Sequence, residues 1–355
     1  MSTIIGEKGR SIGLDCARAF AIILVITSHF SRNSKYLGFW GVEIFFSLSG
    51  FLIGQILWRN YSIESNWDLN KIFNFWSRRW WRTLPNYYLF FFINLLLNYF
   101  LLKPIPQFHN LLNYAVFGQN FVSRSIGFFE VSWSLCVEEW LYLSFPIILF
   151  FASKIIKSRS VSFIFTILIL VMACAAFRYF ASNSIRSNDL RVITLARLDA
   201  IAYGILSAYF FTVIKVGDVK KKVLFFIGCV LLLSPIVIKL MCKWDLDKII
   251  NNQIVLVLVP LGAALMLPTI NSSSNYKSNF ITRSITKVSL WSYSLYLCHM
   301  PILYILYKII GENYKVFFIN LSAKIIGLGF AIFISSVLFK YFEAPLTAKR
   351  PKEIK

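Results

Sequence analysis

Residues 14–30, LDCARAFAIILVITSHF, form an apolar run that carries Asp15 and Arg18 near its start and His29 near its end. An α-helix turns about 100° and rises about 1.5 Å per residue, so Arg18 and His29 would lie within about 20° of each other around the helix and roughly 16 Å apart along it. Asp15 would lie about 40° from His29. Ionisable groups on one stripe of a membrane-length helix normally face a bundle interior or a water-filled cavity, because lipid offers them no partners. The stripe is therefore the first candidate for a functional site.

The composition is that of a polytopic membrane protein. The chain has 355 residues, of which 57% are hydrophobic and 17% aromatic, and its mean hydropathy is +0.65. Its apolar runs are long enough to cross a hydrocarbon core of roughly 30 Å as helices, whereas barrel strands would show alternation over roughly 10 residues. We therefore predict an all-α helical bundle that forms a single domain over residues 1–355. About ten spans are expected, at residues 13–31, 38–58, 84–102, 133–152, 161–180, 196–214, 223–239, 253–270, 288–308 and 317–342.

The net charge of +21 would suggest a nucleic acid partner in a soluble protein, but here the basic residues separate hydrophobic runs and do not line one exposed face. Topology signalling and contact with anionic lipid headgroups explain them better. With the N-terminus inside, the cytoplasmic segments hold more Lys and Arg than the external ones, so both termini are expected in the cytoplasm. The six cysteines are scattered without a CxxC pair, which indicates neither a disulfide framework nor a metal site.

A basic and aromatic cluster, RRWWR at residues 78–82, ends the longest expected cytoplasmic loop, residues 59–83. Such a cluster at a membrane boundary is most often an interfacial anchor. Alternatively, Arg79 and Arg82, three apart on a helical turn, would clamp a phosphate-bearing ligand from the cytoplasm. The residues alone leave both interpretations open.

Charged residues inside spans are costly and are therefore functional candidates. His29 is the natural general base, because imidazole titrates near neutral pH. Glu138 is its expected carboxylate partner, with Asp199 second. For an isolated histidine, a hydrogen bond to a backbone carbonyl at the interface would be the commoner role, but the stripe shared with Asp15 favours catalysis. The other charged candidates are Glu43, Glu139, Arg197 and Glu343.

Several of these residues have structural alternatives. Glu138 and Glu139 would alternatively form an ion pair with Arg197 inside the bundle. His299, near the outer end of the ninth span, is a second candidate base, and its neighbours favour a structural or acceptor-side role. A serine in an apolar span, such as Ser134, more often makes interhelical hydrogen bonds than acts as a nucleophile. The residues expected to contact a substrate are Glu43, Trp133, Ser134, Arg197, Asp199 and His299.

The signatures of several enzyme classes are missing from the sequence. It has no Gly-x-Ser-x-Gly elbow, no Walker loop and no His-Glu-x-x-His, so a serine hydrolase, an ATPase and a zinc protease all lack their usual signals. A transporter or a flippase of a lipid-linked sugar is a non-enzymatic alternative, although no clear internal repeat supports it. A polysaccharide polymerase would be expected to carry long external loops with several arginines.

Taken together, the motifs resemble the membrane acyltransferase-3 family of bacterial polysaccharide and lipopolysaccharide O-acetyltransferases. The resemblance covers nearly the whole chain. Arg18 and His29 match the family's Arg/Lys-x10-His pattern, and Arg79 and Arg82 match its Arg-x-x-Arg pattern. The motifs, in the family's order, are LDCARAFAIILVITSHF, GVEIFFSLSGFLI, the Arg79-Trp-Trp-Arg82 pair, WSLCVEEWLYLSFP, RLDAIAYG, SYSLYLCHMPI and YFEAP.

The resemblance implies transfer of an acyl group, usually acetyl, from cytoplasmic acetyl-CoA to a sugar hydroxyl on the outer side of the bacterial inner membrane. His29 would be the catalytic histidine, and Arg79 and Arg82 would hold the coenzyme phosphates. Arg18 and Asp15 would belong to the donor-side end of the helix. The roughly 16 Å from Arg18 to His29 is comparable to an extended pantetheine arm. Direct attack by the activated hydroxyl and an acyl-enzyme intermediate both stay open.

Two features depart from many members of that family. Many relatives carry an additional extracytoplasmic SGNH hydrolase-like domain, whereas this chain ends thirteen residues after Phe342, so we expect a stand-alone transmembrane form. Cys16 occupies a position that often holds glycine, which we expect to change only local packing. The acceptor class stays open between O-antigen or lipopolysaccharide, capsule and exopolysaccharide.

Overall fold

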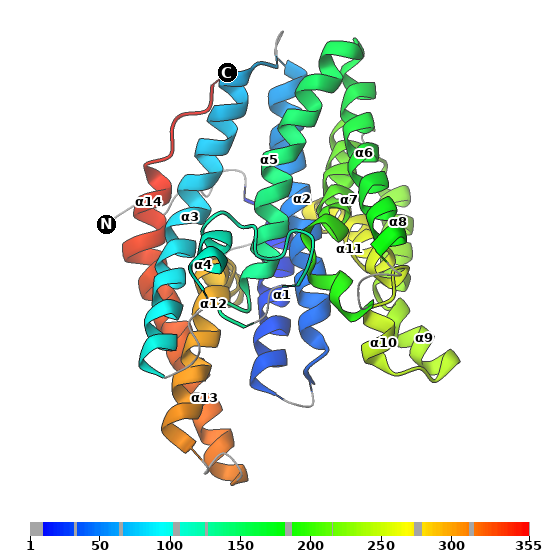
Figure 1. Ribbon diagram of the computed structural model, residues 1–355. Helices are drawn as coiled ribbons and strands as arrows, with labels where there is room; N and C mark the ends of the chain where they lie inside the picture. The colour runs from blue at the N-terminus through cyan, green and yellow to red at the C-terminus, as the bar shows by residue number, and fades with distance from the viewer. Residues whose placement is uncertain are drawn as a thin grey trace.

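The computed structural model is a bundle of long helices (Figure 1), and the residues that it describes contain no β-strand. The predicted all-α class is therefore confirmed. The described residues are 10–31, 34–63, 67–101, 107–124, 127–181, 187–214, 216–272, 279–311 and 316–354.

The described residues form fourteen α-helices, with short 3-10 and π-helical segments between some of them. Two 3-10 helices, Ser187–Val192 and Thr194–Ala196, precede α7, and π-helical turns follow α7 over Phe210–Ile214 and α13 over Phe339–Glu343. The α-helices are α1 (Ile12–Phe30), α2 (Leu37–Ile63), α3 (Leu69–Phe100), α4 (Phe108–Ala115), α5 (Ser132–Ile155), α6 (Arg159–Ala181), α7 (Leu198–Tyr209), α8 (Asp218–Leu232), α9 (Ser234–Cys242), α10 (Leu246–Ile250), α11 (Val255–Ser272), α12 (Phe280–Ile310), α13 (Phe317–Leu338) and α14 (Ala344–Ala348).

Each of the ten predicted spans coincides with helix. Among the described residues, seven helical stretches are long and apolar enough to cross a membrane, and α8 with α9, bent by 47° at their junction, would make an eighth. The other two predicted spans correspond to the apolar half of α3 and to the shorter stretch Leu198–Ile214. The chain is thus a multi-pass membrane protein with seven or eight candidate crossings among its described residues, and the total of ten stays a prediction.

The segment 59–83 is largely helical where the sequence predicts a cytoplasmic loop. α2 continues to Ile63, and α3 already begins at Leu69. The Asp68 side chain caps α3 by accepting a hydrogen bond from the Lys71 amide at 2.9 Å. Hydropathy locates the edge of the apolar layer, whereas a capped helix can extend well beyond it. The cytoplasmic location of the segment stays a prediction.

Two glycines bring α2 and α7 into backbone contact. A Cβ atom added to Gly50 of α2 would lie 1.9 Å from the Ile201 carbonyl oxygen, and one added to Gly204 of α7 would lie 2.1 Å from the Ser47 carbonyl oxygen. Small residues at a crossing let membrane helices approach closely, and van der Waals packing then holds them together. This crossing fixes α2, a helix that lines the two cavities described in the next subsection.

Replacing Gly50 with alanine is expected to destabilise the folded protein by roughly 1–3 kcal/mol, because the added methyl group collides with backbone atoms that cannot rotate away. Thermal unfolding of the purified protein in detergent measures the effect. Gly329→Ala on α13 is the matched control, since nothing lies within 4 Å of its Cβ position. Equal melting temperatures for the two variants would contradict the close crossing of α2 and α7.

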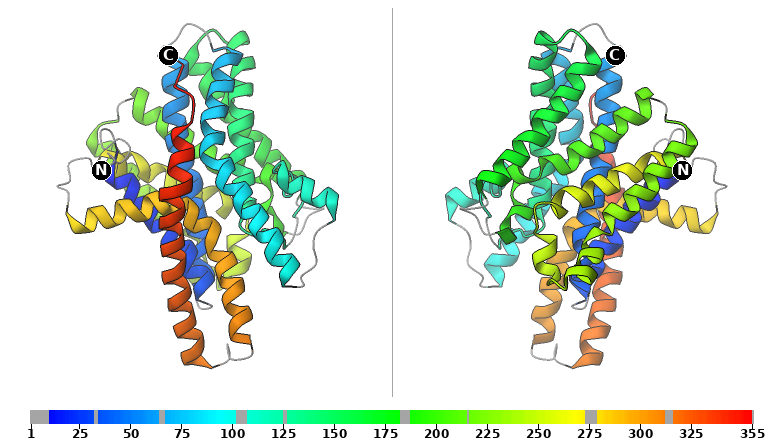
Figure 2. Two further views of the ribbon diagram at one scale, coloured as in Figure 1. Left: turned by 90° about the vertical axis from the view of Figure 1, so that its left-hand side faces the viewer. Right: turned by 90° about the vertical axis from the view of Figure 1, so that its right-hand side faces the viewer.

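The two ends of the bundle differ in shape. α12 and α13 pack side by side and extend beyond the other helices at one end (Figure 2). At the opposite end, the C-terminal segment returns to α2 and α3 (Figure 1). There Glu353 pairs with Arg59 at 2.5 Å, and Arg78 donates to the Pro351 carbonyl oxygen at 2.7 Å. These contacts join the C-terminal segment to α2 and α3 on the side that the charge distribution predicts to be cytoplasmic.

Candidate active site

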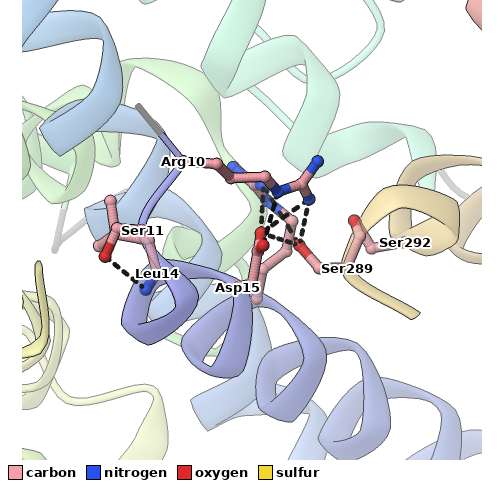
Figure 3. A network of polar contacts seen from close by, with 7 residues as sticks. Arg10, Ser11, Leu14, Asp15, Ser289 and Ser292 are labelled. Atoms are coloured by element: carbon pink, nitrogen blue, oxygen red, sulfur yellow. Dashed lines mark hydrogen bonds and ion pairs between the residues drawn. The ribbon is translucent and has the colours of Figure 1, made fainter. Parts of the chain in front are cut away.

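Asp15 is buried near the start of α1 and is engaged by charged and polar side chains (Figure 3). Arg10, just before α1, donates to its carboxylate from Nε at 2.5 Å and from Nη2 at 2.7 Å. Ser289 of α12 donates from Oγ to Asp15 Oδ1 at 2.7 Å. Arg18 is more distant, with Nη1 3.9 Å from the same oxygen. Asp15 therefore ties the start of α1 to α12 and does not closely neutralise Arg18.

A cavity of about 330 Å³ opens between α1, α2, α3, α5 and α12. We call it the arginine chamber, because the side chains of Arg18, Arg79 and Arg82 all line it. Arg18 comes from α1, whereas Arg79 and Arg82 come from successive turns of α3. The arginines that the sequence places in two separate motifs therefore share one cavity.

The arginine chamber has an excess of positive charge. Within the described part of the chain, Arg79 and Arg82 form no ion pair with a carboxylate. Glu138 lines the chamber too, and it accepts hydrogen bonds from Ser49 Oγ and Tyr142 OH, each at 3.0 Å. Guanidinium groups without a close carboxylate suit an anionic ligand, because they offer charged, bidentate donors.

The two tryptophans of the RRWWR cluster, residues 78–82, do not share the position of its arginines. Trp80 and Trp81 are 39% and 38% exposed, whereas neither lines the arginine chamber. The interfacial-anchor interpretation thus suits the two tryptophans, while the anion-site interpretation suits the arginines that flank them.

A second cavity, of about 340 Å³, lies at the other end of α1. We call it the histidine chamber, because His29 lines it as an exposed side chain. Trp133 of α5 and Arg191 of the 3-10 helix Ser187–Val192 line it as well. The two ends of the α1 stripe therefore face two different cavities.

His29 contacts a second histidine. Its ring centroid lies 5.0 Å from that of His299, which is fully buried on α12. His299 Nδ1 lies 3.2 Å from the Leu295 carbonyl oxygen, and its Nε2 has no hydrogen-bond partner among the described residues. His299 is thus placed to hold the ring of His29 and does not itself line either chamber.

The expected pairing of Glu138 with His29 is not made. Within the described residues His29 forms no ion pair with a carboxylate, and Glu138 lies in the arginine chamber. Asp199, the second expected partner, instead pairs with Arg178 at 2.7 Å. Glu138 is instead held in the arginine chamber by its hydrogen bonds with Ser49 of α2 and Tyr142 of α5.

Glu43, Arg197 and Asp199 are fully buried and lie outside both chamber linings. Arg197 pairs with Glu43 through Nη2 and donates from Nη1 to the Leu256 carbonyl oxygen at 3.0 Å. The alternative that Glu138 and Glu139 pair with Arg197 is therefore wrong, because Glu43 occupies that guanidinium. The Glu43–Arg197 pair joins α2 to the residue before α7 and, through Leu256, to α11, whereas the Asp199–Arg178 pair joins α7 to α6. A contact between these residues and a substrate stays a prediction.

The two chambers meet at Val42 of α2 and Tyr296 of α12, which line both. The Tyr296 hydroxyl donates to the Val131 carbonyl oxygen at 3.0 Å and lies 2.7 Å from Ser134 Oγ. The ring of Tyr296 also lies 5.8 Å from that of His299. Tyr296 is not among the residues predicted from the sequence, although its position one helical turn before His299 could have indicated it.

The family described as "Acyltransferase domain" matches residues 11–341. The chain belongs to this acyltransferase family. Among curated proteins, the O-acetyltransferase OatA of Staphylococcus aureus strain NCTC 8325 and that of strain COL are each 26% identical to it over 358 residues, which is 95% of this chain and 57% of each relative. The chain thus spans little more than half the length of these relatives. No solved structure matches it.

Both chambers lie wholly within the acyltransferase match, since every residue of their linings falls inside residues 11–341. The acyltransferase domain therefore contains an arginine-rich cavity, a histidine-bearing cavity and the boundary between them. In the described part of the chain, no group of three or more His, Cys, Asp or Glu side chains is arranged to hold a metal ion.

Proposed function

We propose that this member of the acyltransferase family moves an acetyl group from cytoplasmic acetyl-CoA to a hydroxyl group of a cell-surface glycan, with His29 as general base. The observation that carries the proposal is that the arginine chamber and the histidine chamber share Val42 and Tyr296. Each substrate would enter its own chamber, and the two would meet at the boundary. The relatives that are named O-acetyltransferases support acetyl as the transferred group.

The arginine chamber suits the donor in charge and in the nature of its walls. Arg79 and Arg82 would bind the phosphates of the coenzyme, because they have no ion pair with a carboxylate in the described residues. Arg18 of α1 would add a third positive charge to the lining of the same chamber. Apolar side chains such as Phe45 and Leu52 also line the chamber and would pack against the uncharged arm that carries the thioester.

The histidine chamber would hold the acceptor, and His29 would activate it. His29 accepts the proton of the sugar hydroxyl while the hydroxyl oxygen bonds to the thioester carbonyl carbon. The carbon–sulfur bond then breaks, and the coenzyme sulfur leaves and takes up the proton, which yields an acetyl ester and free thiol. This direct route is favoured over an acyl-serine, because the Ser134 hydroxyl is already hydrogen-bonded to Tyr296.

The reaction would take place across the bacterial inner membrane, with both termini and the arginine chamber on the cytoplasmic side. The excess of Lys and Arg in the segments on that side supports this orientation. A C-terminal tag that a protease removes from right-side-out vesicles would contradict it.

The function itself is tested with the purified protein in liposomes, given labelled acetyl-CoA and glycan extracted from the cell surface. We expect label in the glycan and O-acetyl signals in its NMR spectrum. Movement of a lipid-linked sugar across the liposome membrane without acetylation would instead support a flippase.

Replacing both Arg79 and Arg82 with glutamine is expected to weaken acetyl-CoA binding at least roughly 100-fold, because hydrogen bonds to charged groups contribute about 1.5–3 kcal/mol each. Isothermal titration calorimetry in detergent measures the affinity. Unchanged affinity in a folded double variant would place the donor elsewhere.

Arg78→Gln is the matched control for that experiment. It removes the same group from the preceding position of α3, where the guanidinium donates to Pro351 and does not line the arginine chamber. We expect its affinity for acetyl-CoA to stay within about twofold of the wild type, since the partly buried ion pair of Arg78 with Glu353, at 3.7 Å, lies outside the chamber.

A further inference from the structure

The histidine chamber contains a positive charge that the proposed reaction does not use. Arg191, in the 3-10 helix Ser187–Val192, lines the chamber and is half-buried. Its guanidinium carbon lies 5.2 Å from the centroid of the Phe39 ring and 5.7 Å from that of the Trp133 ring. Contact with aromatic faces orients a guanidinium without satisfying its hydrogen-bond donors.

The other basic side chains of this lining already have acidic partners. Lys35 Nζ lies 3.0 Å from Asp247, and Arg124 Nη1 lies 3.2 Å from Asp189. Among the described residues, Arg191 has no ion pair, and its buried Nε has no hydrogen-bond partner. Arg191 is therefore the lining cation whose charge is left for a ligand.

Two carboxylates near Arg191 do not neutralise it. Glu130 also lines the histidine chamber, but it forms no ion pair with Arg191 in the part of the chain that the structure describes. Glu43 acts on Arg191 only from a distance, because its carboxylate is bound to Arg197. Burial lowers the pKa of Arg191 to about 10, so the guanidinium remains charged at neutral pH.

We propose that Arg191 binds an anionic substituent of the acceptor sugar, a carboxylate or a phosphate, while His29 receives a hydroxyl of the same sugar. The planar fork of a guanidinium matches both anions bidentately. Because Arg191 and His29 line one cavity of about 340 Å³, a bound anion would fix which hydroxyl faces the histidine. The preferred acceptor is then a uronic acid or a phosphorylated sugar. The inference rests on the proposed acyl transfer and names its acceptor class.

Three small probes test the inference by binding, independently of turnover. Methyl β-glucuronoside carries a carboxylate, glucose 6-phosphate carries a phosphate, and methyl β-glucoside is neutral. Each probe is added to the purified chain in detergent, and the melting temperature is measured. We expect the anionic probe that matches the natural substituent to give the same rise in melting temperature as the neutral probe at a concentration roughly tenfold or more lower. The stronger of the two anionic probes identifies the substituent.

Arg191→Gln is expected to remove this preference, and Arg191→Lys to leave an intermediate one, because lysine keeps the charge and loses the fork. Should the glutamine variant fail to fold, the lysine variant still reports on the fork. Arg124→Gln is the matched control, since it removes a guanidinium from the same lining that is already paired with Asp189. We expect it to keep the preference.

The proposal would be overturned by a wild type that does not discriminate the anionic from the neutral probes, or by a preference that survives in Arg191→Gln. Acetyl transfer from labelled acetyl-CoA to the same probes is measured separately. Transfer without discrimination would overturn only the role of Arg191. Discrimination without any transfer would leave the anion site standing and count against the proposed function.

Discussion

Replacing His29 with alanine is expected to lower acetyl transfer by roughly 10²–10⁴-fold, because that is the usual contribution of a positioned general base. Affinity for acetyl-CoA should stay close to that of the wild type, since His29 lines the histidine chamber and not the arginine chamber. Transfer is measured with labelled acetyl-CoA in liposomes, and donor affinity by calorimetry. A loss of transfer with unchanged donor affinity would separate the chemical step from donor binding.

His109→Ala is the control for this experiment, because His109 is an exposed histidine that lines neither chamber. We expect its transfer rate to match that of the wild type. A His29→Ala protein that melts normally and still transfers acetyl at nearly the original rate would rule out His29 as the base. His299 would then be the next residue to examine, since its ring contacts that of His29.

Local features of the sequence predict much of the fold and part of the site geometry. Apolar length and helical period depend only on neighbouring residues, so the all-α class and the positions of the spans follow from them. The polar stripe of α1 also depends only on residues close together in the chain, and two of its residues, Arg18 and His29, line cavities. The spacing of Arg79 and Arg82 likewise places both on one side of a helix. Their catalytic and binding roles remain predictions.

The sequence around a residue does not determine which residue it contacts when that partner lies far away in the chain. Arg197 and its partner Glu43 are 154 positions apart in the chain. Several carboxylates in the spans could have served Arg197 equally well, and only the α2–α7 crossing selects Glu43. For the same reason the sequence alone does not determine which chamber Glu138 lines. Trp133, five residues earlier on α5, lines the histidine chamber, whereas Glu138 lines the arginine chamber.

Enlarging the buried apolar side chain at the boundary between the chambers is expected to slow acetyl transfer. Val42 is 6% exposed and lines both chambers, so its size sets the opening through which donor and acceptor groups would meet. Val42→Phe is expected to lower acetyl transfer by roughly 10²-fold, because displacing reacting atoms by about 1 Å can have an effect of that size. Donor affinity should change far less, since Arg79 and Arg82 are untouched.

The readouts for Val42→Phe are acetyl transfer in liposomes, donor affinity by calorimetry and melting temperature in detergent. Val230→Phe makes the same change at an exposed position of α8 outside both chambers, and we expect it to behave like the wild type in all three. A normally folded Val42→Phe protein with wild-type transfer would mean that the substrates do not meet beside Val42. Loss of transfer with retained donor binding would place the reaction at the junction of the two chambers, which Val42 and Tyr296 line.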